Sequence, residues 1–109
     1  MEYDNLIESL FDNYNRKYLY IKLNEVFYNN DIDKNNFLIS CLNILPTSSC
    51  FDFLIYRYKY FVEYKHKDWL YLVNRLTDMG KYTLNLFLVS YTDFTLSDLR
   101  MINLIEVVL

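Results

Sequence analysis

The stretch Leu76-Thr77-Asp78-Met79-Gly80 is the most informative short segment of this chain, because it lies between two strongly apolar helical patterns. Upstream, apolar residues at helical spacing predict a helix over residues 68–79 that begins at the capping residue Asp68. Gly80 is expected to end that helix in the left-handed conformation that glycine adopts most readily. The apolar spacing resumes over residues 81–91 and predicts a further helix there.

Polar and turn-forming residues divide the rest of the chain into pieces of helical length. Within each piece, apolar side chains recur at the spacing of one helix face. The first of these faces consists of Tyr3, Leu6, Ile7, Leu10, Phe11 and Tyr14. We expect helices over residues 3–14, 16–29, 36–45 and 49–64, and a last helix that begins at residue 95.

Several helix ends carry recognisable signals. Asn15 is placed to cap the second helix, and Pro46 should end the third, because proline disfavours helical geometry in the residue before it. Residues 49–52 (Ser-Cys-Phe-Asp) and 95–98 (Thr-Leu-Ser-Asp) each match a capping box, which predicts that the fourth helix and the last helix begin there. Along the last helix, one apolar face contains Leu99, Ile102 and Ile105.

Residues 56–64 are the ambiguous part of this pattern, since aromatic and charged side chains alternate there with the two-residue period of a strand. The helical period fits them equally well, and a lone strand would lack a partner. We therefore expect helix. The chain as a whole is predicted to be all-α, a bundle of six helices with an extra C-terminal helix.

Composition and charge narrow the class of protein. The 109 residues favour one domain, and a 53% apolar share with 19% aromatic residues is ample for a buried core. A net charge of −3 with dispersed Lys and Arg argues against a nucleic-acid partner. The chain lacks both a secretion signal and a run of about 18 apolar residues, so we expect a cytoplasmic protein that does not cross a membrane.

Reactive motifs are missing from the sequence. Cys41 and Cys50 are the two cysteines and His66 is the single histidine, without the spacing of a zinc site. There is no phosphate-cradling glycine loop and no nucleophile with a histidine near it in the chain. We expect no catalytic activity, no metal site and no cofactor.

Three short segments, in this order, resemble the pyrin domain of the death-fold superfamily. Leu10-Phe11-Asp12-Asn13-Tyr14 is similar to the Leu-Glu-Asp-Leu end of its first helix, Ile21-Lys22 to a Phe-Lys pair in its second, and residues 76–80 to its Leu-x-Asp-Met-Gly junction. The resemblance covers about residues 3–91. It implies a six-helix death-fold domain over residues 1–91, with residues 92–109 as a helical extension that packs on the domain.

A stand-alone pyrin domain rich in Asn, Tyr, Ile and Lys resembles the pyrin-only proteins of poxviruses. The resemblance implies a decoy that binds host pyrin domains such as that of the inflammasome adaptor ASC, inhibits inflammasome assembly and also dampens NF-κB signalling. Self-association is a further property of this family. The residues leave one alternative open, a poxvirus Bcl-2-like helical protein that binds amphipathic death-ligand helices in an apolar groove.

Pyrin domains stack an acidic face on helices one and four against a basic face on helices two and three, and such charge matching selects partners. The resemblance places the acidic face at Asp4, Glu8, Asp12, Asp52 and Glu63, and the basic face at Arg16, Lys17 and Lys22. The basic face is thin, so we expect a one-sided cap that terminates a filament. The acids of the first helix also fit the solvated face of an amphipathic helix, which needs no partner.

Overall fold

The computed structural model describes residues 2–29, 31–57, 61, 63–102 and 104. Within these residues the chain forms seven α-helices and no β-strand, so the expected all-α class is confirmed. The helices are α1 (Asp4–Asn13), α2 (Arg16–Phe27), α3 (Lys34–Ile44), α4 (Thr47–Leu54), α6 (His66–Val73), α7 (Asp78–Tyr91) and α8 (Leu96–Met101).

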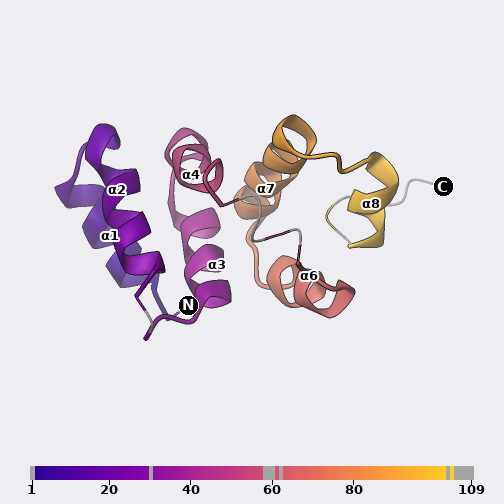
Figure 1. Ribbon diagram of the computed structural model, residues 1–109, viewed down its shortest axis with the longest axis horizontal. Coiled ribbons are helices and arrows are strands. Elements are labelled where there is room, and N and C mark those ends of the chain that lie inside the picture. The colour runs from indigo at the N-terminus through magenta and orange to yellow at the C-terminus, as the bar shows by residue number, and fades with distance from the viewer. Residues whose placement is uncertain (1, 30, 58–60, 62, 103, 105–109) are drawn as a thin grey trace.

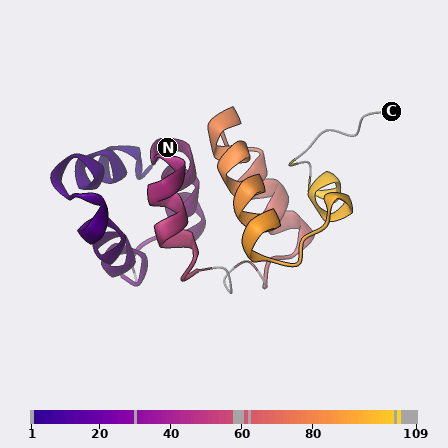
Figure 2. The same ribbon diagram turned by 90° about the horizontal axis from the view of Figure 1, so that it is seen from above.

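The helices are stacked along the long axis of a body that measures 45 × 25 × 22 Å (Figure 1). Helix α1 packs on α2 and α3, and α2 packs on α4. Helices α3 and α4 in turn pack on α7, and α8 lies at the far end (Figure 2). The order of the contacts therefore follows the order of the chain, as in proteins built from stacked helix pairs.

Aromatic side chains link successive helices through one apolar core. Phe27 of α2, Phe37 of α3 and Phe53 of α4 form a buried cluster with ring centroids 5.6–6.1 Å apart. Nearer α8, Phe61 stacks on Trp69 of α6 at 5.4 Å. Burial of each such ring contributes roughly 2–3 kcal/mol, so these contacts fix how the helices are stacked.

Two of the predicted helix ends are confirmed. The capping box of α8 is present, since the Asp98 carboxylate accepts the Thr95 N–H at 2.7 Å and the Thr95 hydroxyl accepts the Asp98 N–H at 3.2 Å. Helix α3 ends at Ile44, before Pro46, as expected. Asn15 occupies the N-cap position of α2, although its side chain makes no capping hydrogen bond.

The predicted start of the fourth helix is wrong. Helix α4 begins at Thr47, with Pro46 at its N-cap, so Ser49 lies buried inside the helix. Proline already has the φ of a helix start and lacks an N–H that would need a partner, which allows the helix to begin directly after it. Helix α4 also ends earlier than expected, and residues 55–57 form a turn. Residues 58–60 and 62, and Ile105 of the last helix, lie outside the described residues.

The predicted helix over residues 68–79 is also wrong at both ends. Helix α6 covers His66–Val73, and Asp68 stands in its first turn, where its carboxylate accepts the Lys65 N–H at 2.9 Å. Thr77 is the N-cap of α7, and its hydroxyl accepts the Gly80 N–H at 3.0 Å. Gly80 therefore lies in the first turn of α7 and does not end a helix.

A close approach between α3 and α7 explains the glycine. A Cβ atom at position 80 would lie 2.4 Å from Oδ1 of Asn43. That oxygen accepts the Thr77 N–H at 2.9 Å and the Thr77 hydroxyl at 3.3 Å, while the Asn43 amide donates to the carbonyl of Arg75 at 3.0 Å. Asn43 thus holds the turn before α7, and only glycine leaves room for it.

Replacement of Gly80 by alanine should lower the free energy of unfolding by about 1–3 kcal/mol. Displacement of Asn43 loses up to three hydrogen bonds at about 0.5–1.5 kcal/mol each, which outweighs the ~1 kcal/mol that alanine gains over glycine in a helix. In an Asn43→Ala background, the same replacement should be neutral or stabilising. Urea unfolding of the four proteins measures both effects, and an equal loss in both backgrounds would contradict this explanation.

Candidate functional site

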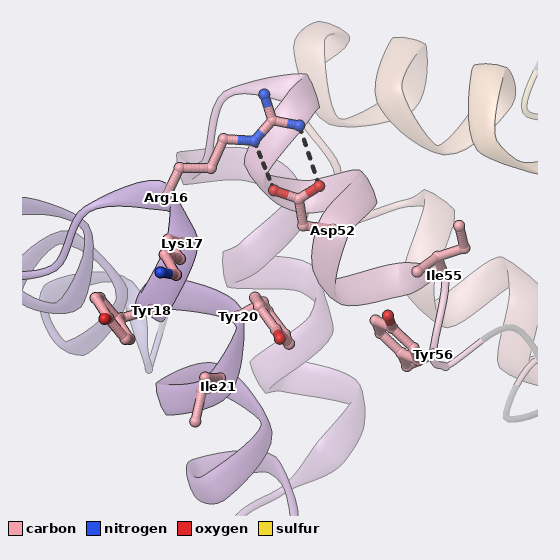
Figure 3. A pocket seen from close by; sticks show the side chains of 8 residues that line it. All are labelled: Arg16, Lys17, Tyr18, Tyr20, Ile21, Asp52, Ile55 and Tyr56. Carbon is pink, nitrogen blue, oxygen red and sulfur yellow. Dashed lines mark hydrogen bonds and ion pairs between the residues drawn. The ribbon is translucent and has the colours of Figure 1, made fainter.

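An open groove of 590 Å³ runs between α2 and α4 (Figure 3). We call it the α2–α4 groove. Helix α2 supplies one wall, and α4 with the turn that follows it supplies the other. The groove is lined by Arg16, Lys17, Tyr18, Tyr20, Ile21, Asp52, Ile55 and Tyr56.

Helix α2 presents apolar side chains on two of its faces. Leu19, Leu23 and Phe27 recur every four residues and are buried against the core. Tyr18 and Ile21 point away from that buried face and are exposed. A helix that only needed to pack on its own core would carry polar residues on this second face. The exposed residues therefore indicate a surface that another molecule covers.

Two contacts join the walls of the groove (Figure 3). At one end Arg16 donates two hydrogen bonds to Asp52, from Nε to Oδ2 at 2.6 Å and from Nη2 to Oδ1 at 3.1 Å. The hydrogen bond and charge of Asp52 raise the pKa of Arg16. At the other end the rings of Tyr20 and Tyr56 stack with centroids 6.1 Å apart. The groove thus has a charged end and an aromatic end.

Arg57 supports the aromatic end from behind. Its side chain is 7% exposed, and its guanidinium lies 4.5 Å from the Tyr28 ring centroid and 5.6 Å from that of Phe53. It donates to the carbonyl of Tyr56 at 2.6 Å and to the Asn24 side chain, which ties α2 to the turn after α4. Burial lowers the pKa of Arg57, but an arginine still remains charged in a protein.

The residues of the expected acidic face lie in different surroundings. Glu8 and Asp12 are exposed on α1, and Glu63 is exposed between α4 and α6. Asp4 is half-buried and accepts a hydrogen bond from the Ser40 hydroxyl of α3 at 2.7 Å. Asp52 is paired with Arg16 in the α2–α4 groove.

The residues of the expected basic face all lie on α2, but they do not share one environment. Arg16 and Lys17 line the α2–α4 groove. Lys22 is half-buried, 5.4 Å from the Tyr14 ring centroid and 3.4 Å from the Glu25 carboxylate. The structure therefore brings one residue of each expected face together, as the Arg16–Asp52 ion pair.

Sequence reasoning missed the aromatic part of the groove and the arginine behind it. Tyr20, Ile55, Tyr56 and Arg57 were not expected to contribute to a site. One signal was present, because Tyr18 and Ile21 fall opposite the buried period of α2. The partners from α4 carry no local signal, since they meet α2 only through the packing of the two helices.

The cysteines are placed as core residues. Both Cys41 and Cys50 are fully buried. Burial raises the pKa of Cys50 to about 12 and that of Cys41 well above its usual range, with a smaller contribution from the charge of Cys50. Thiols with such pKa values are poor nucleophiles at neutral pH.

The described residues contain no group of three or more His, Cys, Asp or Glu side chains with the arrangement of a metal site. Among the helices of the described part, none has both the length and the apolar character needed to span a membrane. Comparison with protein-family models, with curated proteins and with solved structures gives no match for this chain. Fold and site together thus define an all-α protein of stacked helices with an exposed groove.

The buried thiols should make the protein less stable in alkaline solution. Unfolded thiols ionise near pH 8.5–9, whereas the folded thiols keep their protons, so stability is lost as pH rises above about 9. Each thiol contributes a slope of up to about 1.4 kcal/mol per pH unit. Urea unfolding between pH 7 and 11 should show a steeper loss for the native protein than for the Cys41→Ala, Cys50→Ala variant; parallel curves would contradict this account.

Replacement of Arg57 by lysine should destabilise the protein by about 1–3 kcal/mol, because lysine cannot make both buried hydrogen bonds of the guanidinium. The control is Arg75→Lys, which changes an exposed guanidinium 3.6 Å from the Tyr71 ring and should cost less than about 1 kcal/mol. Thermal melting followed by circular dichroism compares the two variants. Equal losses would show that the buried contacts of Arg57 do not matter.

Proposed function

We propose that this protein is a helical interaction module that binds an amphipathic helix of a partner protein in the α2–α4 groove. The observation that carries the proposal is the set of exposed apolar and aromatic side chains at the groove, namely Tyr18, Ile21, Ile55 and Tyr56. Monomeric proteins seldom leave such patches uncovered, and tyrosine and arginine are enriched where proteins meet.

The shape and charge of the groove describe the partner. Two neighbouring helices form a trough that a third helix fills with residues at i, i+3 or i+4, and i+7. At the charged end Arg16 and Asp52 neutralise one another, which leaves the positive charge of Lys17. The partner helix therefore carries an apolar stripe and an acidic residue near one end of it.

Binding accounts for the observed chemistry better than catalysis does. The two thiols are buried and protonated at neutral pH. The Arg16 and Asp52 side chains, which could hold a substrate, already satisfy one another. The exposed groups of the groove are mainly phenol rings and isoleucine side chains, which contribute contact area to an interface.

The pyrin-type decoy that the sequence resemblance implies is the second candidate. Glu8 and Asp12 are exposed one turn apart on α1, as an acidic contact surface requires. In this candidate the chain occupies the pyrin domain of ASC and thereby inhibits inflammasome assembly. Its contact surface is narrower than the sequence implies, because Asp4 and Asp52 are engaged within the molecule.

Binding of two probes separates the candidates. The first is a fluorescein-labelled peptide of a death-ligand helix, followed by anisotropy, and the second is the ASC pyrin domain, followed by inhibition of its filament assembly. Tyr56, 65% exposed, is the groove residue whose replacement disturbs the core least. Tyr56→Asp should weaken peptide binding at least tenfold, because it puts a charge against the apolar stripe of the peptide.

Tyr82→Asp is the matched control, since Tyr82 is 57% exposed on α7, outside the groove. It should leave peptide affinity unchanged. Equal affinities of the Tyr56→Asp variant and the native protein would rule out the groove. Inhibition of ASC filaments that Asp12→Lys abolishes would establish the second candidate, and failure of both probes to bind would reject both.

A further inference from the structure

A second cavity, of 810 Å³, lies where the end of α7, the following loop and α8 meet α6. It is far along the molecule from the α2–α4 groove, toward α8 in Figure 1. Its volume is within the range of small-molecule sites. The cavity is lined by Phe61, Tyr64, Trp69, Ser90, Tyr91, Thr92, Asp93, Phe94 and Asp98.

Aromatic rings form its walls at steep angles to one another. The ring of Tyr64 stands at 69° to that of Trp69 with centroids 4.9 Å apart, and the ring of Phe94 stands at 63° with centroids 5.2 Å apart. Tyr91, which is exposed, contributes a further ring at the edge. Rings set in this way surround a small volume with the negative faces of their π-systems.

The charge of the cavity has one sign. Asp93 and Asp98 are its charged residues, and none of its described lining residues is basic. Hydrogen bonds from the backbone and hydroxyl of Thr95 lower the pKa of Asp98, which keeps this carboxylate ionised at neutral pH. Asp93 is exposed and lies in the loop between α7 and α8.

We propose that this cavity binds a quaternary ammonium group. A methylated cation has an apolar surface that fits between aromatic rings and a diffuse charge that ring faces attract. Two carboxylates at the same cavity add long-range attraction for a cation and disfavour anions. The aromatic rings alone would suit a neutral apolar ligand, and the carboxylates alone would suit a hydrated metal ion; their combination selects an organic cation.

Such a group occurs in choline headgroups and in trimethyl-lysine side chains. The chemistry of the cavity is the same for both, so two probes distinguish the source. The first is free choline, and the second is a short peptide that contains trimethyl-lysine, compared with the same peptide containing unmodified lysine. This site is independent of the α2–α4 groove, and either proposal can fail without the other.

Trp69 is the only tryptophan of the chain and lines the cavity, so its fluorescence reports on binding without a label. Titration with choline should change the emission in a saturable manner. The neutral isostere 3,3-dimethylbutan-1-ol should bind at least fivefold more weakly, because it has the shape of choline without the charge. Trimethyl-lysine peptide that binds at least fivefold tighter than choline identifies a modified protein as the source, and the reverse order identifies a headgroup.

Asp93→Asn should weaken choline binding at least threefold and leave the isostere unaffected. Asp12→Asn on α1, also exposed and outside the cavity, should change neither. Phe94→Leu removes one ring and should lower choline affinity further, with thermal melting as the check that the variant is folded. Equal binding of choline and its neutral isostere, or no response of Trp69 to choline and to the trimethyl-lysine peptide, would overturn the proposal.

Discussion

The burial of α3 on every side is the constraint on which the rest of the structure depends. Residues 37–42 are six consecutive buried positions, which an amphipathic surface helix cannot have. A helix of this kind needs a neighbour in each direction, and α1, α4, α6 and α7 provide them. Because α2 reaches the core only through α1 and α4, one of its faces remains outside, and that face forms a wall of the α2–α4 groove.

Apolar periodicity was sufficient to predict the helical class and the positions of α1, α2 and α3, because each of these helices buries a repeating set of large side chains. It failed where tertiary contacts decide the outcome. Gly80 looks like a helix end in the sequence, but its lack of a side chain answers to Asn43, which is 37 positions earlier in the chain. Likewise, Asp52 matches a local capping signal, yet Arg16 of another helix is its partner.

The same distinction applies to the candidate site. Glu8, Asp12 and Lys17 could be predicted as exposed charges, since charged residues rarely enter a core. Which charges face one another depends on helix packing that no local pattern encodes. The chain-ordered stacking of α1 to α8 also differs from a bundle in which the first and last helices close round one core. This stacking leaves long lateral grooves, which is why groove binding is favoured over stacking of charged faces.

Tyrosine explains why the surface is harder to predict than the core. A tyrosine at an apolar position of a helix pattern satisfies the periodicity whether it is buried or exposed, because its ring is apolar and its hydroxyl is polar. In α1, the expected apolar face includes Phe11 and Tyr14, and both are exposed, whereas Ile7 is buried. The 12 tyrosines therefore contribute both to helix packing and to the walls of the groove and the cavity. Contact area of this kind is available at low conformational cost, since a tyrosine has few rotatable bonds to order when a partner binds.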